Sequence, residues 1–311
     1  MSDASSATSL AGPGSPGPAA LPSARPRRPR GSIRFGEVLG VVPFIAFALL
    51  FMLLPMIYLF GAAFVDRQGQ FTLQNIVDLN QPQILSAYWI SIRISATSAF
   101  LGVVIGLAIA LAIIRGGLPA PIRSAVMTFS GVASNFAGVP LAFAFIATLG
   151  RLGIATIFLR TIGIDIYGAG FNLFGFWGLT ITYLYFQIPL MVLIIAPAID
   201  GLKKEWGEAA ATLGASRWQF WRYVGMPVLF PPLLGTLSLL FANAFGAIAT
   251  AYALTGSTLN IVPVLLYAQM RGDALQNPGL GAALALGMVV VCAIANIIYL
   301  AISARAERWM K

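Results

Sequence analysis

The chain has 311 residues, of which 59% are hydrophobic and only 9% are charged, and its formal net charge is +9. Soluble domains carry about 25% charged residues, so this composition excludes a soluble domain and predicts a polytopic α-helical membrane protein. Histidine is absent and Cys292 is the single cysteine, which excludes an internal disulfide and removes the commonest general base and metal ligand. No GxxxxGK[ST] phosphate loop occurs in the sequence, so nucleotide energy would have to come from another chain.

The first segment, residues 1–38, is rich in Pro, Ala and Ser and carries a cluster of arginines from Arg25 to Arg30. It has too little apolar surface to form a core, so we expect a disordered basic tail. Residues 39–304 form the predicted membrane domain, and residues 305–311 form a short C-terminal tail.

Six apolar runs follow the tail, and each is long enough to cross a bilayer as a helix. They cover residues 39–65, 88–114, 122–150, 171–199, 231–255 and 279–304. The predicted fold is therefore an all-α integral membrane protein with six transmembrane helices.

The distribution of Lys and Arg predicts the orientation. With the N-terminus inside, most of the basic residues fall in the tails and in the connections after the second and fourth runs, and few fall in the others. By the positive-inside rule both termini are cytoplasmic, and so is the connection between the fourth and fifth runs. The excess positive charge then has a topological explanation, and we expect a lipid bilayer and no nucleic acid as its partner.

That cytoplasmic connection contains helix start and stop signals. Asp200 is positioned to cap a short helix over 203–213, and Gly214 is suited to a left-handed stop. Ser216 and Gln219 form a capping-box pattern that starts a second short helix, and Pro227 marks entry to the next span. Two interpretations stay open on physical grounds: a surface that docks a partner, or a helix pair that lies at the lipid headgroups.

The same connection resembles the EAA signature of ABC-importer permeases. Glu208-Ala209-Ala210 is followed after three residues by Gly214, and after nine more by Val224-Gly225-Met226-Pro227. Val224 and Met226 stand where that signature has Ile and Leu. The resemblance implies a type I (MetI-like) importer bundle in which Glu208, Ala209, Ala210, Gly214 and Pro227 belong to a cytoplasmic coupling helix and its motif. Glu205, Arg217 and Trp218 would support this coupling loop.

The resemblance also implies partners. A permease of this kind works in a bacterial inner membrane with two ATP-binding subunits, a second permease subunit (identical or homologous) and an extracytoplasmic solute-binding protein. ATP and Mg would bind the ATPase subunits, and this chain would hold no cofactor or metal and perform no covalent chemistry. The run 185–190 (YFQIPL) resembles the spermidine/putrescine branch, which implies a polyamine; aminoethylphosphonate, thiamine and ferric iron are the alternatives.

Polar side chains inside the apolar runs are candidates for a translocation path, because hydrocarbon penalises them. Asn135, Gln187 and Asn243 lie in the third, fourth and fifth runs. Arg93, close to the outer end of the second run, is interpreted as the only ionisable residue within a span. Further polar residues of this kind are Ser134, Thr250, Tyr252 and Asn296. The alternative is that each forms a hydrogen bond between helices, or that Arg93 extends to the membrane surface. The outer connections 151–170 and 256–278 could contact a substrate-delivering protein.

Two other functional classes are alternatives to a transporter. A membrane-embedded enzyme would need a cluster of His, Cys, Asp or Glu at membrane depth, and the runs contain none. An uncoupled membrane scaffold or channel would not need the connection after the fourth run to bind an ATPase.

Overall fold

The computed structural model describes residues 35–66, 68–271 and 277–307. Within these ranges every regular element is a helix, and the only extended pairing is an isolated antiparallel bridge between Val65 and Phe71. The tail predicted over residues 1–38 falls mostly outside the described residues. Residues 272–276 of the connection predicted over 256–278 also lie outside them.

The chain divides into two units, Met1–Leu53 and Leu54–Lys311. The described part of the first unit holds α1 (Phe35–Phe47) and the π-helix η1 (Ala48–Leu53). The second unit holds α2 (Leu54–Ala62), α3 (Gln74–Asp78), α4 (Pro82–Arg115), α5 (Ala120–Asn135), α6 (Val139–Leu149), α7 (Ile154–Thr161), α8 (Phe176–Asp200), α9 (Lys204–Thr212), α10 (Arg217–Phe220), the π-helix η2 (Trp221–Gly225), α11 (Met226–Phe245), α12 (Ile248–Thr255), α13 (Val262–Arg271) and α14 (Pro278–Glu307).

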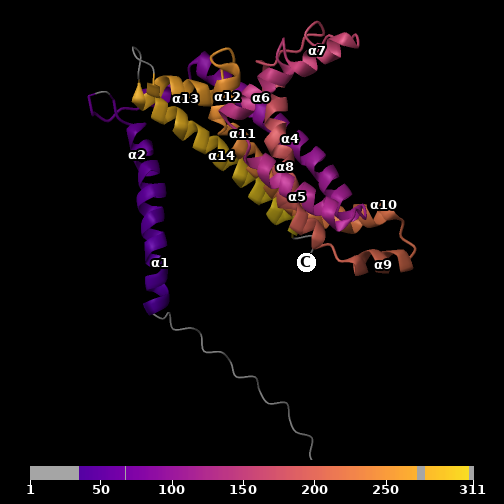
Figure 1. Ribbon diagram of the computed structural model, residues 1–311. Helices are drawn as coiled ribbons and strands as arrows, with labels where there is room; N and C mark the ends of the chain where they lie inside the picture. The colour runs from indigo at the N-terminus through magenta and orange to yellow at the C-terminus, as the bar shows by residue number, and fades with distance from the viewer. Residues whose placement is uncertain (1–34, 67, 272–276, 308–311) are drawn as a thin grey trace, which may run out of the picture. The chain divides into compact units, whose positions relative to one another are not determined.

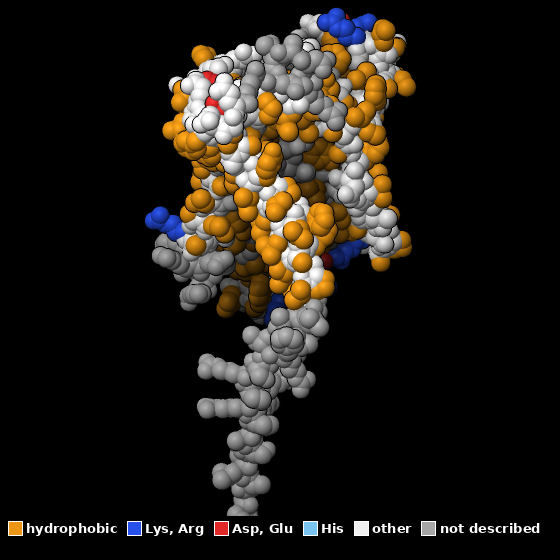
Figure 2. Space-filling model, turned by 90° about the vertical axis from the view of Figure 1, so that its left-hand side faces the viewer, with side chains coloured by type: hydrophobic (Ala, Val, Ile, Leu, Met, Phe, Trp, Pro, Cys, Tyr) orange, Lys and Arg blue, Asp and Glu red, His pale blue; other side chains and the backbone are white. Residues whose placement is uncertain are grey.

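Six helical segments of the described residues are long and apolar enough to cross a membrane, which confirms the predicted number. They are Val41–Ala62, Pro82–Arg115, Val139–Thr161, Phe176–Asp200, Arg217–Phe245 and Pro278–Arg305. Apolar side chains dominate the face shown in Figure 2, as a surface in contact with hydrocarbon requires.

The prediction of a single third helix over 122–150 is wrong. The structure breaks it into α5 and α6, and the apolar segment of spanning length is Val139–Thr161. Gly138 causes the break, because its φ of +75° belongs to a region of backbone space that favours glycine. Pro140 then lies in the first turn of α6, where its missing N–H has no intrahelical partner to lose.

The bounds of the fifth spanning helix also differ from the prediction of 231–255. α10, η2 and α11 follow one another without interruption, so the spanning segment begins at Arg217 and ends at Phe245. The π-helical turn lies just before Pro227, where the proline ring would clash with the carbonyl of Tyr223 in a regular α-helix. Residues 248–255 form a separate helix, α12, so Thr250 and Tyr252 are not on the fifth span.

α8 lies at the centre of the second unit, and α4, α5 and α11 pack against it (Figure 1). α4 and α8 approach closely at Gly106, where an added Cβ would lie 2.6 Å from Cγ of Met191. Small residues permit such contacts between helix backbones in membrane bundles. α9 and α10 lie at one end of this unit, the α9 end, and α6, α7, α12 and α13 lie at the other, the α7 end (Figure 1).

Candidate functional site

The connection between α8 and α11 presents α9 as an exposed helix. None of the residues of α9, all of which are described, is buried. Glu208 and Ala209 are exposed, Ala210 is half-buried, and Leu213, just beyond the helix, is 88% exposed. Glu205 is also exposed. Because a helix of this length is marginal in water without packing, its surface is suited to contact with another molecule.

Two hydrogen bonds stop α9 where the sequence predicts. The backbone N–H of Gly214 donates to Ala211 O at 2.9 Å, and the N–H of Ala215 donates to Ala210 O at 2.9 Å. This pair of bonds is the Schellman motif, which requires a left-handed residue. Gly214 supplies it with φ +78°, so the predicted left-handed stop is confirmed.

The return to the membrane begins with a capping box, as predicted. Gln219 N–H donates to Ser216 Oγ at 3.2 Å, and Ser216 N–H donates to Gln219 Oε1 at 2.7 Å. Two orphan N–H groups at the helix start are thereby satisfied. Arg217 and Trp218 follow on the exposed surface of α10, with Trp218 71% exposed. Pro227 lies in the first turn of α11 and is exposed.

The prediction that Asp200 caps the helix of this connection is wrong. Asp200 is the last residue of α8, and α9 is preceded by Lys203, which forms no side-chain cap. The Asp200 carboxylate instead pairs with Arg123, with Nη2 and Oδ2 2.6 Å apart. This ion pair joins residues far apart in the sequence, so spacing along the chain could not reveal it. Two residues after Asp200, the carbonyl oxygen of Leu202 accepts a hydrogen bond from Arg115 Nη2 at 2.6 Å.

The candidate path residues lie in different surroundings. Gln187 is fully buried between α4, α8 and α11, where Nε2 donates to Ser98 Oγ at 3.3 Å and to Leu240 O at 3.4 Å. Asn135 is exposed at the end of α5 and donates to Gly131 O at 2.9 Å. The contacts of Gln187 are those of a side chain that joins helices.

Asn243 is exposed near the end of α11, and Arg93 is exposed on α4 with its guanidinium 5.3 Å from the ring centre of Phe176. This distance is within the range of a cation–π contact. A passage shared by Asn135, Gln187 and Asn243 stays a prediction.

The two helix breaks are tied to neighbouring segments. The N–H of Gly138, between α5 and α6, donates to Oγ1 of the buried Thr250 on α12 at 2.7 Å. The Tyr183 hydroxyl of α8 donates to the carbonyl of Ala247, between α11 and α12, at 3.1 Å. Backbone groups freed by a break at membrane depth need such partners.

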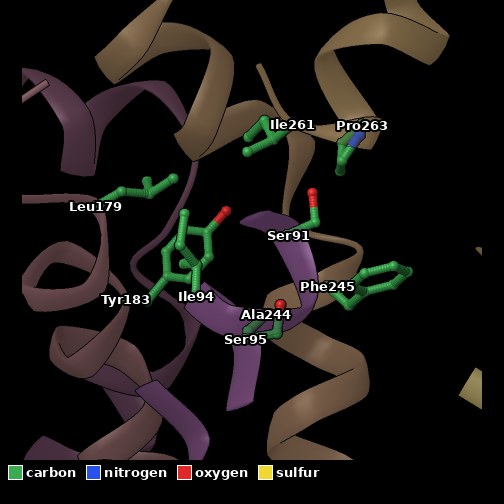
Figure 3. Close-up of a pocket in the computed structure, with 9 residues that line it drawn as sticks. All are labelled: Ser91, Ile94, Ser95, Leu179, Tyr183, Ala244, Phe245, Ile261 and Pro263. Atoms are coloured by element: carbon green, nitrogen blue, oxygen red, sulfur yellow. The ribbon is translucent and has the colours of Figure 1, made fainter. Parts of the chain in front are cut away.

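Three hydroxyl groups that the sequence did not single out surround a small cavity of about 10 Å³. Ser91 and Ser95 of α4 and Tyr183 of α8 line it, together with apolar side chains (Figure 3). Ser91 Oγ accepts a hydrogen bond from Val262 N–H at 3.0 Å. The cavity has room for about one water molecule. The spacing of Ser91 and Ser95 is the available signal, because it places both on one face of a helix.

The connection after α7 contains a charged turn. Gly168 N–H donates to the Asp165 carboxylate at 3.1 Å, and Arg160 lies 3.7 Å from the same oxygen. The pKa of Asp165 is lowered from its ordinary value, first by the Gly168 N–H and then by the Arg160 charge. Leu152, which lies between α6 and α7, is 87% exposed. Contact of this segment with a delivering protein stays a prediction.

Comparison with known proteins identifies relatives along most of the chain. The family described as "Binding-protein-dependent transport system inner membrane component" matches residues 19–308. The probable sulfate transport system permease protein cysT of Nephroselmis olivacea is 26% identical over 233 residues, covering 73% of this chain and 78% of the relative. The molybdenum transport system permease protein ModB of Mycobacterium tuberculosis is 27% identical over 221 residues, covering 70% and 78%. The thiamine transport system permease protein ThiP of Escherichia coli is 24% identical over 212 residues, covering 67% and 38%.

Solved structures share the fold. A bacterial ABC transporter involved in the import of the acidic polysaccharide alginate has a chain with a TM-score of 0.70 and 21% identity, covering 86% of this chain and 94% of that one. A bacterial alginate ABC transporter in complex with an alginate pentasaccharide-bound periplasmic protein has a chain with a TM-score of 0.68 and 21% identity, covering 86% of this chain and 93% of that one. The predicted type I importer permease fold is confirmed. This chain belongs to the family of binding-protein-dependent transport system inner membrane components.

Proposed function

We propose that the chain is the permease subunit of an ATP-driven importer and that α9 is the helix through which a separate ATPase drives it. The observation that carries the proposal is the form of the α8–α11 connection. It presents Glu208 and Ala209 on a helix with no buried residue, and its shape is fixed by the Schellman motif at Gly214 and the capping box at Ser216. A rigid exposed helix can transmit force to the bundle, whereas an unstructured connection would absorb it.

The α9 end faces the cytoplasm in this proposal, and so do both termini. Support comes from the basic residues in the connections at that end and at the adjoining ends of the spanning segments, which are Arg115, Arg123, Lys203, Lys204, Arg217 and Arg222. Lys and Arg are enriched in cytoplasmic connections. The membrane is then the bacterial inner membrane, in keeping with the family description.

The partners we propose are two ATP-binding subunits, a second permease subunit and an extracytoplasmic binding protein. The EAA-type pattern of Glu208 to Pro227 supports an ATPase that binds ATP and Mg on its own chain. The structurally similar alginate transporter was crystallised with a periplasmic protein, which supports a delivering protein as partner. Because the α9 end is cytoplasmic in this proposal, that protein would bind at the α7 end. ATP binding need only favour one packing of the helices over another to move the bundle between outward-facing and inward-facing states.

For the solute we propose a small oxyanion of the sulfate or molybdate class. Two of the relatives named above are sulfate and molybdenum permeases, and none of those named is a polyamine permease. Arg93 lies within a span, and all ten acidic residues of the chain lie at or beyond the ends of the spanning segments. This distribution favours an anion over the polyamine expected from residues 185–190. Thiamine is the second candidate, supported by the similarity to ThiP.

Co-purification and uptake test the proposal together. The full chain, extracted in detergent, should co-elute with an ATPase subunit, and Glu208→Lys should abolish that association while the protein stays inserted. Cells that lack the chain should lose uptake of radiolabelled sulfate or molybdate and keep uptake of spermidine. A chain that elutes alone and passes solute without ATP hydrolysis would support the uncoupled channel instead.

A further inference from the structure

The base of the α8–α9 connection is held by two arginines from a different connection. Arg115 ends α4 and Arg123 lies in the first turn of α5, on either side of residues 116–119. Arg115 donates to the Leu202 carbonyl at 2.6 Å, and Arg123 pairs with Asp200 at 2.6 Å. The ends of α4 and α5 are therefore both bound to the point where α8 ends.

The side chains at this point reinforce the attachment. Leu202 is 2% exposed and packs in one apolar cluster with Ile199 of α8 and Ile113 of α4. Lys203, the next residue, is exposed, and α9 beyond it has no buried residue. Residues 200–202 are therefore attached to the helix bundle, whereas the connection is exposed from Lys203 onward.

The charges suit their positions as well. The last carbonyl groups of α8 lack intrahelical partners and carry the negative end of the helix dipole, which cations stabilise. Arg115 and Arg123 bring two cations to that end from helices that also pack along α8. Arginine holds this geometry better than lysine, because its planar guanidinium offers several donors in fixed directions.

We propose that Arg115 and Arg123 are positioning residues that transmit a displacement of α9 to α4, α5 and α8 as one body. This inference rests on the proposed coupling role of α9. With both contacts made, a pull on α9 reaches three helices through residues 200–202. With the contacts removed, the chain at Gly201 and Leu202 can bend alone, so that ATP is hydrolysed without movement of the bundle.

The test uses the complete importer, reconstituted in vesicles with its ATPase and binding protein, and measures solute imported per ATP hydrolysed. Arg123→Asp and Asp200→Arg, made singly, should each lower this ratio by about threefold to tenfold. Each variant loses an ion pair whose side chains are 41% and 46% exposed, and it adds a like-charge contact; each of these effects is at most about fivefold at such positions. The ATPase should still co-purify with each variant. The double exchange Arg123→Asp with Asp200→Arg rebuilds the pair in reverse and should return the ratio to within about twofold of wild type.

Arg115 is tested by Arg115→Ala against Arg115→Lys. Alanine removes the donor to Leu202 O and should lower the ratio as above, and lysine, which keeps a donor, should lose less. Arg305→Asp on α14 makes the same charge change as Arg123→Asp at an exposed position and should leave the ratio unchanged.

Three results would overturn the inference. Single variants with the wild-type ratio would show that the contacts transmit nothing. A double exchange as poor as its parents, with all variants equally stable to heating in detergent, would show that the ion pair is not the cause. A wild-type chain that binds no ATPase would remove the proposed function and this inference together, whereas the first two results leave the proposed function intact.

Discussion

Gly214 offers the sharpest test of the idea that the shape of the α9 connection matters. Its φ is +78°, and an added Cβ would meet nothing within 4 Å. Gly214→Ala therefore introduces no clash, and its whole effect is the cost of placing an L-residue in the left-handed region. That cost is about 1–2 kcal/mol, which corresponds to roughly a fivefold to thirtyfold smaller population of the Schellman stop.

Gly207 supplies the matched control within the same helix. It too has open space around the position of a Cβ, and its φ is not positive. Gly207→Ala should therefore stabilise α9 by about 0.8–1 kcal/mol, because alanine is the better helix former. The two substitutions add the same methyl group to the same exposed segment and are expected to act in opposite directions.

The assay is uptake per ATP hydrolysed in the reconstituted importer. Gly214→Ala should lower that ratio at least severalfold and Gly207→Ala should preserve it. Gly214→Pro should act more strongly, because proline cannot adopt the positive φ and also lacks the N–H that donates to Ala211 O. Equal ratios for both alanine variants and wild type would refute the reasoning that the stop at Gly214 holds α9 in its working shape.

Three other predictions concern stability and assembly. Gly106→Ala would place a Cβ 2.7 Å from Cβ of Met191 and should cost about 1–3 kcal/mol of stability in detergent. Gly131→Ala is the control, because an added Cβ there has nothing within 4 Å, and it should leave stability unchanged or raise it. Equal thermal midpoints for the two variants would contradict this packing. Thr250→Val removes the acceptor of the Gly138 N–H and should cost about 1–3 kcal/mol, while Thr250→Ser should retain most of the stability, as thermal unfolding can measure. Glu208→Lys should abolish co-elution of the ATPase without changing the amount of inserted chain, and undiminished co-elution would remove Glu208 from the contact.

Local signals predicted the α9 connection well. The glycine stop and the capping box depend on residues within a few positions of one another, so Gly214, Ser216 and Gln219 could be interpreted without tertiary information. The number of spanning segments was predictable for a similar reason, since length and apolarity alone decide it.

The helix breaks and the partners of polar side chains were harder to predict. Runs of apolar residues hide the ends of helices inside them, and only Gly138 followed by Pro140 marked the break between α5 and α6. Asp200 carries a cap-type side chain, yet the tertiary contact with Arg123 determines its role. From the sequence alone, Gln187 fits a translocation path or a hydrogen bond between helices. Its contacts with α4 and α11 are visible only in the structure.

We propose that α9 lies in the cytoplasm and binds a separate ATPase, and cysteine labelling tests both points most directly. In a Cys292→Ser background, Leu213→Cys beside α9 and Leu152→Cys at the α7 end place single thiols at positions that are 88% and 87% exposed. A membrane-impermeant maleimide should label Leu152→Cys in intact cells and Leu213→Cys only in inverted vesicles, where added ATPase subunit should protect it. Labelling of Leu213→Cys from outside the cell, or labelling that the ATPase does not reduce, would contradict the account.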